Sequence, residues 1–323
     1  MALLKSIYRV FFTLALASLL LACAPPREPV NLAGNQWLGY QPLYLADASG
    51  CVQCPFLEQY YGERAYKLTM MPSTTVVTRL MANGQLDGAL VTLDEAISLQ
   101  SRSNLDVCVA RVLSFSAGAD AMLMAENVNF AKKPLMIGYE ETALGGYFLQ
   151  RAMDSLLLTR DDIETRMLLP TEHAEGLASG SVDMVITYQP FISQLEALGA
   201  QVVFDSSEIP HEIVDVLLVR SEVWRREQQM LEWLVADLWE SGRRSLFDRE
   251  SATESMLLNN TGLNQEELEA ALTGLHFPDY QENRQMLRAE LATIVGNLNT
   301  YMHGNGLIEQ SAVLPSCYEL TGE

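Results

Sequence analysis

Basic residues are scarce in this chain of 323 residues. Lysine and arginine together number 21 against 41 aspartates and glutamates, so the formal net charge at pH 7 is −20. A surface this acidic repels phosphate backbones, which argues against nucleic acid as a partner. The charge does not identify a small ligand, because surface charge mostly sets solubility and local dipoles can still hold an anion.

The short motifs of common catalytic sites are also missing. The chain contains no G-x-S-x-G, H-E-x-x-H or P-loop pattern, and its four histidines are scattered singly at positions 173, 211, 276 and 303. We expect His173 to lie on an exposed helix. The sequence therefore predicts no enzyme activity, no cofactor and no metal site.

Long apolar runs are absent except near the N-terminus. Lys5 and Arg9 precede a stretch over residues 10–21 that is apolar apart from Thr13 and Ser18. A small residue, Ala22, and then Cys23 follow it. The run is too short to cross a bilayer with ease, and Pro25 follows at once. The pattern therefore predicts a secretory signal rather than a membrane span.

The sequence Leu20-Leu21-Ala22-Cys23 resembles the lipobox of bacterial lipoproteins, in which the cysteine becomes the acylated N-terminus. The resemblance implies a signal peptide over residues 1–22, a lipid on Cys23 and a linker over residues 23–30. It implies a lipid-anchored protein on the periplasmic face of a membrane in a bacterial cell envelope, with the bilayer as a partner. An ordinary signal peptide that happens to contain a cysteine is the alternative.

Cysteine is sparse, with five residues in all. Once Cys23 is acylated, Cys51, Cys54, Cys108 and Cys317 remain, which permits two disulfides with three possible pairings in an oxidising compartment. A redox pair normally opens a helix after a strand, whereas Cys51 and Cys54 lie between a glycine and a proline. A structural role is favoured for this pair over a redox or metal-binding role.

Strand and helix patterns alternate through much of the chain. Apolar strand patterns occupy residues 30–33, 86–91, 107–113, 136–139 and 214–219. Several of these strands are followed by the predicted start of a helix. At one such start, Thr92 and Glu95 match the capping box S/T-x-x-E. The alternation predicts an α/β fold with a largely parallel sheet, followed from residue 221 by a mainly helical region.

One short helix–glycine–strand motif occurs twice in the sequence. A helix ends at Gly84 and again at Gly180, an aspartate follows three residues later (Asp87 and Asp183), and an apolar strand then leads to a threonine. The two glycines lie 96 residues apart, a spacing that suits two similar lobes. Chance recurrence of a common α/β pattern is the alternative.

Two polar segments, residues 114–120 and 208–215, suit crossings between such lobes. We expect lobe 1 to comprise residues 31–115 plus 217–323, and lobe 2 to comprise residues 116–216. The roughly 300 residues left after signal removal are enough for one large or two modest domains.

Asn35-Gln36-Trp37-Leu38-Gly39-Tyr40-Gln41-Pro42 resembles the opening signature of extracytoplasmic solute-binding proteins of ABC importers, in the branch that serves sulfonates, nitrate and thiamine-precursor pyrimidines. Further similar segments extend the resemblance over about residues 30–220. It implies a two-lobed periplasmic-binding-protein fold (type II-like), with two hinge crossings, a cleft that closes on ligand and a helical C-terminal region. In that family the W-x-G-Y-x-P loop forms one wall of the cleft.

Ligands of open α/β sheets bind beyond the carboxyl ends of strands, near the starts of the following helices. The free N–H groups there suit a sulfonate, nitrate or carboxylate, whereas Asp94 and Glu95 oppose an anion and favour an amine or pyrimidinium. Capping alone is a sufficient role for Ser73 or Thr74. The candidate ligand-binding residues are Trp37, Gly39, Tyr40, Ser73, Thr74, Thr92, Glu95, Thr142, Gly145, Gly146 and Tyr188.

The main hypothesis is a lipid-anchored extracytoplasmic receptor. It would bind a small organic or anionic solute between its lobes and deliver it to an ABC permease. The alternative is a sensory solute-binding lipoprotein that regulates a membrane signalling protein. A related eukaryotic branch makes the thiamine pyrimidine by consuming its own histidine beside a cysteine-rich iron site, and the Cys51–Cys54 pair does not supply such a cluster.

Overall fold

The structure is a computed structural model, and it describes residues 28–49, 65–248 and 251–322. The predicted signal peptide, Cys23, Cys51 and Cys54 lie outside the described residues. None of the described helices combines the length and the apolarity that a membrane crossing needs.

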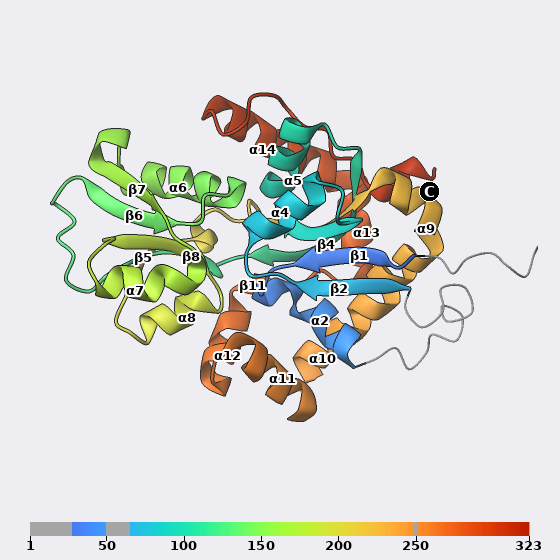
Figure 1. The fold of residues 1–323 in the computed structure, drawn as a ribbon, viewed down its shortest axis with the longest axis horizontal. Helices are drawn as coiled ribbons and strands as arrows, with labels where there is room; N and C mark the ends of the chain where they lie inside the picture. The colour runs from blue at the N-terminus through green and yellow to red at the C-terminus, as the bar shows by residue number, and fades with distance from the viewer. Residues whose placement is uncertain (1–27, 50–64, 249–250, 323) are drawn as a thin grey trace, which may run out of the picture. The chain divides into compact units, whose positions relative to one another are not determined.

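The first of two sheets has six strands (Figure 1). Across the sheet they are β11 (Leu275–His276), β4 (Val107–Ser116), β10 (Val214–Arg220), β3 (Gly88–Thr92), β1 (Val30–Gly34) and β2 (Tyr66–Met70). Strands β1 and β3 pair in parallel, whereas β10 is antiparallel to both of its neighbours.

The second sheet has five strands. They are β7 (Ile163–Met167), β6 (Leu135–Tyr139), β8 (Met184–Tyr188), β5 (Asp120–Met124) and β9 (Gln201–Asp205), in that order. Strand β6 is parallel to β7 and β8, and β5 is antiparallel to β8 and β9. The α/β class and the two lobes are confirmed, one lobe on each sheet.

The expectation of a largely parallel sheet is wrong for the strands beside the crossings. The chain leaves the first sheet along β4 and returns along β10, and it enters the second sheet along β5 and leaves along β9. Because an outgoing and a returning strand lie side by side in each sheet, each pair is antiparallel. The parallel pairs are those whose strands are joined through helices.

The two crossings are joined to each other by Ser206. Its buried hydroxyl lies 2.7 Å from the Ser116 hydroxyl and accepts hydrogen bonds from the backbone N–H groups of Gly118 (2.7 Å) and Asp120 (3.4 Å). The first crossing follows β4 and the second follows β9, so one side chain holds both segments in register.

Helices cover both faces of each sheet (Figure 1). On the first sheet, α4 (Thr74–Ala82) and α5 (Leu93–Ser103) lie on one face, and α2 (Gln41–Ala48) and α10 (Trp239–Asp248) on the other. A Cβ atom at Gly242 of α10 would lie 1.7 Å from the Pro42 carbonyl oxygen, so only glycine permits this approach of α10 to α2.

On the second sheet, α6 (Ala143–Leu156) covers one face, and α7 (His173–Ala178) and α8 (Phe191–Glu196) cover the other (Figure 1). Leu123, Val185 and Ile192 belong to the buried cluster beneath α7 and α8. The expectation that His173 is exposed is wrong: it is fully buried at the start of α7, and burial lowers its pKa to about 4. The short helix packs its first residue against the sheet.

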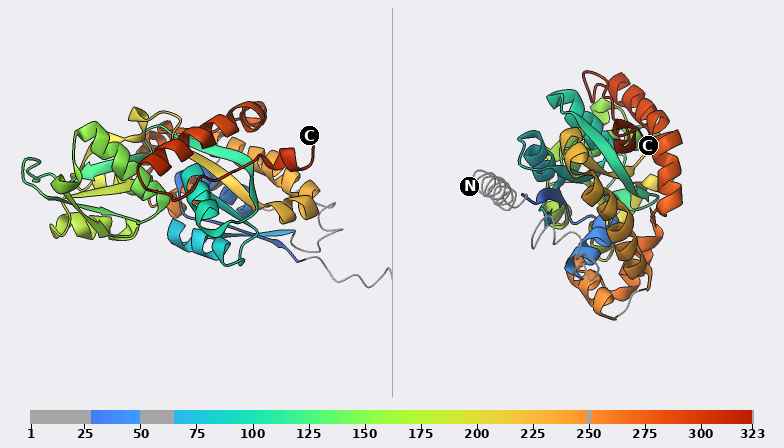
Figure 2. Two further views of the ribbon diagram at one scale, coloured as in Figure 1. Left: turned by 90° about the horizontal axis from the view of Figure 1, so that it is seen from above. Right: turned by 90° about the vertical axis from the view of Figure 1, so that its right-hand side faces the viewer.

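The predicted helical C-terminal region is confirmed. It contains α9 (Ser221–Trp233), a π-helical segment η5 (Leu234–Leu238), α10, α11 (Ser251–Thr261), α12 (Gln265–Thr273), α13 (Tyr280–Gln285), a second π-helical segment η6 (Met286–Glu290) and α14 (Leu291–Gly304). Figure 2 shows α14, in red, beside α5 of the first lobe. Near its end, the Tyr301 ring contacts Tyr147 of α6, so this helix contacts both lobes.

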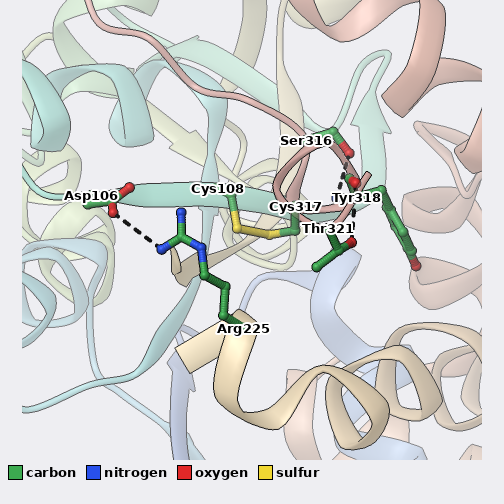
Figure 3. Close-up of a disulfide and its surroundings, with 7 residues drawn as sticks. All are labelled: Asp106, Cys108, Arg225, Ser316, Cys317, Tyr318 and Thr321. Atoms are coloured by element: carbon green, nitrogen blue, oxygen red, sulfur yellow. Dashed lines mark hydrogen bonds and ion pairs between the residues drawn. A yellow bond between two sulfur atoms is a disulfide. The ribbon is translucent and has the colours of Figure 1, made fainter. Parts of the chain in front are cut away.

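A disulfide joins Cys108 of β4 to Cys317 in the C-terminal tail (Figure 3). The tail runs beside β4, where the Val109 N–H donates a 2.9 Å hydrogen bond to the Pro315 carbonyl. The sequence left three pairings open, and this disulfide belongs to one of them. Cys51 and Cys54 lie outside the described residues.

Candidate ligand-binding site

A pocket of about 20 Å³ lies between the two lobes. Its walls come from the loop after β1, the starts of α4, α5 and α6, the end of β8 and the starts of β5 and β10. These are largely carboxyl ends of strands and starts of helices, where open α/β sheets bind ligands. The lining residues are Asn35, Trp37, Tyr40, Thr74, Thr92, Glu95, Asp120, Leu144, Tyr188 and Asp215.

The structure brings six of the sequence-predicted residues to this pocket. Trp37, Tyr40, Thr74, Thr92 and Glu95 come from the first lobe, and Tyr188 comes from the second. The rings of Trp37 and Tyr188 meet edge to face, with their centroids 5.6 Å apart. Aromatic side chains from both lobes therefore form part of the wall.

Two of the remaining predicted residues serve as helix caps. The Ser73 hydroxyl accepts a 3.4 Å hydrogen bond from the Val76 N–H at the start of α4, and the Thr142 hydroxyl accepts one of 3.1 Å from the Gly145 N–H at the start of α6. Thr142 borders a separate hollow between α4, α5 and α6. Each hydroxyl satisfies a backbone donor that the helix leaves free.

The three glycines among the candidate ligand-binding residues, Gly39, Gly145 and Gly146, do not line the pocket. A Cβ atom at Gly39 would lie 2.2 Å from the Ser114 hydroxyl, and one at Gly145 would lie 2.3 Å from the Glu140 carbonyl oxygen. One at Gly146 would touch only Leu307, at 3.5 Å. Gly39 and Gly145 thus allow close packing within the protein rather than approach of a ligand to the backbone.

Asp215 is a pocket residue that the sequence reasoning missed. It is the second residue of β10, it is buried, and its carboxylate accepts hydrogen bonds from Trp37 Nε1 (2.9 Å), the Tyr40 hydroxyl (3.1 Å) and the Ser114 hydroxyl (2.6 Å). Burial raises its pKa to about 6, against the opposing effect of these three donors. A lone acid opening an otherwise apolar strand was the available signal.

Asp120 carries the same signal and was also missed. It begins β5 and is only 4 % exposed, and burial raises its pKa to about 7. Within the part of the chain that the structure describes, its Oδ2 atom has no hydrogen-bond partner. The same holds for the hydroxyl of Thr92, which lines the same pocket.

The predicted capping box of α5 is absent. Thr92 stands at the N-cap position, but its side chain makes no capping hydrogen bond. Glu95 instead crosses between the lobes, where its Oε1 atom accepts a 3.0 Å hydrogen bond from the Leu144 N–H in the first turn of α6. The free N–H groups and positive end of α6 offer this carboxylate an alternative to its own helix.

Two further hydrogen-bonded contacts join the lobes around the pocket. Asn35 Nδ2 donates to the Tyr188 hydroxyl at 3.1 Å. The backbone N–H and the hydroxyl of Thr75 both donate to Glu140 Oε1, at 2.9 and 2.5 Å. Together with the bond between Glu95 and Leu144, these contacts close the lobes over a space that holds about one water-sized group.

The ionisable carboxyl and basic groups of the pocket lining are all acidic. Three of the lining side chains are carboxylic acids, Glu95, Asp120 and Asp215, and none is lysine, arginine or histidine. Among the described residues, no three His, Cys, Asp or Glu side chains are grouped so as to hold a metal ion.

Two α/β lobes, two crossings and a pocket walled by both lobes define the class of two-lobed periplasmic binding proteins. The fold is similar to that of the periplasmic aliphatic sulphonate binding protein SsuA from Escherichia coli, with a TM-score of 0.68 and 16% identity over 88% of this chain and 95% of that one. The alkanesulfonate-binding SsuA from Xanthomonas axonopodis pv. citri, bound to MOPS, gives a TM-score of 0.70 and 16% identity over 90% and 98%. The desulfurization enzyme DSZB gives 0.62 and 15% over 91% and 98%, so an enzyme shares this fold.

The model of the NMT1-like family matches residues 23–258, and the chain belongs to that family. No curated protein matches the sequence.

Proposed function

We propose that the protein is an extracytoplasmic receptor that binds a small organic solute between its lobes and delivers it to an ABC importer. The observation that carries this proposal is the pocket, whose walls come from both lobes and which hydrogen bonds between the lobes close. A solute that contacts both walls favours the closed form, which an importer can distinguish from the open one. The sulfonate-binding proteins of the same fold support this function.

The proposed lobes are residues 31–115 plus 217–323 and residues 116–216, with hinges at the two crossings. Small-angle X-ray scattering tests their closure, after a thermal-shift screen of sulfonates, nitrate, pyrimidines, amines and flavin precursors has identified a ligand. The radius of gyration should be smaller with saturating ligand than without it. Identical scattering profiles would contradict the two-lobed clamp.

We propose binding rather than catalysis, although DSZB shows that the fold can serve an enzyme. The carboxylate of Asp215 is occupied by three donors from the protein itself, and none of the lining residues is a histidine or a cysteine. The ligand should therefore be recovered chemically unchanged after prolonged incubation with the protein. Mass spectrometry that finds a new product would replace the receptor by an enzyme.

Anchoring through Cys23 completes the proposal. A Cys23→Ser protein should lose metabolic labelling by palmitate and leave the membrane fraction, whereas unchanged labelling would refute the lipobox. A single acyl chain holds only marginally, so the mature protein should carry more than one. Genes for a permease and an ATPase beside this gene would favour uptake, and a lone signalling receptor there would favour sensing.

A further inference from the structure

Resting on the proposed receptor function, we propose that the solute carries a positively charged nitrogen. Asp120 accepts a hydrogen bond from that nitrogen, and Trp37 and Tyr188 cover the adjoining carbon atoms. The ligand class is therefore an amine, an amidine or a protonated nitrogen heterocycle, and not a sulfonate.

A buried carboxylate oxygen of the pocket, Asp120 Oδ2, lacks a donor among the described residues. Asp120 Oδ2 and the Thr92 hydroxyl are buried, line the pocket and have no hydrogen-bond partner within the described residues. A buried carboxylate oxygen left without a partner is unfavourable, because the water that would solvate it has been removed. A ligand N–H group supplies the missing donor, whereas a sulfonate oxygen does not.

The charges around the pocket point the same way. Glu95 and Asp215 lie in its walls with Asp120, and no basic side chain belongs to the described lining. Three donors of the lining already have acceptors: Trp37 Nε1 and the Tyr40 hydroxyl donate to Asp215, and the Leu144 N–H donates to Glu95. An anion would meet three carboxyl groups without a compensating cation.

The aromatic walls suit the same ligand. A cation over the face of tryptophan or tyrosine is attracted by the negative charge of the ring face, and the attraction grows when water is excluded. Trp37 and Tyr188 line the pocket from opposite lobes, and both are largely buried. Because the two rings contact each other edge to face, an ammonium group bound near Asp120 would lie beside this ring pair.

Binding should also depend on pH. Burial holds the pKa of Asp120 at about 7, with Asp215 as a further cause, and a bound cation favours the ionised carboxylate. The other titratable groups that face Asp120 are acids or phenols, so none of them supplies a positive charge: Asp94, Asp215 and Tyr188. Affinity for an ammonium ligand should rise between about pH 5 and about pH 8, with release of a proton on binding.

The test compares compounds that differ only in their charged group. Benzylammonium, benzyl alcohol and phenylmethanesulfonate are titrated calorimetrically into the purified protein, and so are ethylammonium, ethanol and ethanesulfonate. We expect an ammonium compound of at least one skeleton to bind at least about tenfold more tightly than its sulfonate, about 1.4 kcal/mol. Tighter binding of either sulfonate, equal binding of both charge types, or no binding of either ammonium compound at millimolar concentration overturns the proposal.

Two variants locate the charge. Asp120→Asn should weaken ammonium binding by about tenfold or more and reduce the rise of affinity with pH, whereas Glu164→Gln, an exposed change in the same lobe, should alter neither. Unchanged affinity in Asp120→Asn overturns the assignment of Asp120. Small-angle scattering separates this proposal from the receptor function. If a sulfonate binds and closes the lobes, the cationic ligand is refuted and the receptor function stands. If none of the compounds that bind closes the lobes, the receptor function is refuted.

Discussion

Trp37 lies in the wall of the pocket, and its indole N–H already has an acceptor within the protein. It donates to the buried Asp215 carboxylate, and the ring is only 4 % exposed. The family resemblance implied only that the loop containing Trp37 forms a wall of the cleft. The structure instead gives this residue two roles, because one edge supports a buried acid while the ring bounds the pocket.

Truncation of Trp37 should therefore affect both binding and stability. Trp37→Ala should weaken ligand binding by about tenfold or more and lower the free energy of unfolding by about 3–5 kcal/mol, the usual effect of removing a buried large ring. Calorimetry and urea unfolding measure the two effects. Trp37→Phe is the matched control, since it keeps an aromatic ring in the wall and loses the N–H donor together with part of the ring area. A fully stable Trp37→Ala protein would show that the buried contacts are unimportant.

The buried Asp120 should make the ligand-free protein less stable as the pH rises. Burial raises its pKa from 3.8 to about 7, so between these values the folded protein holds a proton that the unfolded chain has released. The contribution of Asp120 to the free energy of unfolding is largest below pH 3.8, falls as the pH rises to about 7 and is constant above that pH. Asp120→Asn does not titrate and should lose less stability between about pH 5 and about pH 8.

Urea unfolding at a series of pH values measures this difference. The exposed Asp161→Asn should behave like the unchanged protein and serves as the control. Parallel stability curves for Asp120→Asn and the unchanged protein would mean that Asp120 titrates normally.

At the scale of elements, the repeated glycine–aspartate motif has the same arrangement in each lobe. Asp87 accepts a 2.8 Å hydrogen bond from the Asn31 N–H at the start of β1, and Asp183 accepts one of 2.8 Å from the Met136 N–H in β6. Each aspartate precedes a strand that is parallel to its partner. The side chain thus satisfies a strand donor just before the ladder begins, which explains the shared spacing.

Removal of this carboxylate should destabilise the lobe that contains it. Asp183→Ala leaves the Met136 N–H without its acceptor and should lower the free energy of unfolding by about 1–3 kcal/mol. Asp87→Ala should have a similar effect through the first lobe. Asp183→Asn retains a side-chain carbonyl as acceptor and should lose less. Equal losses for the alanine and asparagine variants, measured by urea unfolding, would argue against the hydrogen bond as the cause.

At the scale of the whole molecule, Glu140 joins the lobes from outside the pocket. Its Oε1 atom accepts from both the N–H and the hydroxyl of Thr75. Because this contact exists only when the lobes meet, its loss favours the open form. Glu140→Ala should therefore increase the radius of gyration of the ligand-free protein and weaken ligand binding.

Small-angle scattering of the ligand-free variant measures this shift. Glu141→Ala alters the next residue, which is exposed, and should leave the scattering profile unchanged. A Glu140→Ala profile that matches that of the unchanged protein would show that the contact does not hold the lobes together.

Local patterns in the sequence determined most of the helices and strands, the cap at Ser73, and the recurrence of one motif in two lobes. These features depend on residues within a few positions of one another, as in the hydrogen bond between Ser73 and Val76. The aromatic loop at Trp37 also predicted part of the pocket. These features can be predicted from the sequence because backbone geometry and side-chain spacing act over one or two helical turns.

Only the tertiary structure decided which acids belong to the site. Asp120 and Asp215 lie at the starts of two strands, within one residue of the first position, beside different crossings, and they reach one pocket because both crossings lie between the lobes. The burial of His173 and the pairing of Cys108 with Cys317 likewise depend on segments distant in the chain. Glu95 matches a local capping box, but its carboxylate instead accepts a hydrogen bond from the Leu144 N–H in the first turn of α6. That donor is distant in the sequence, so no local pattern could predict this contact.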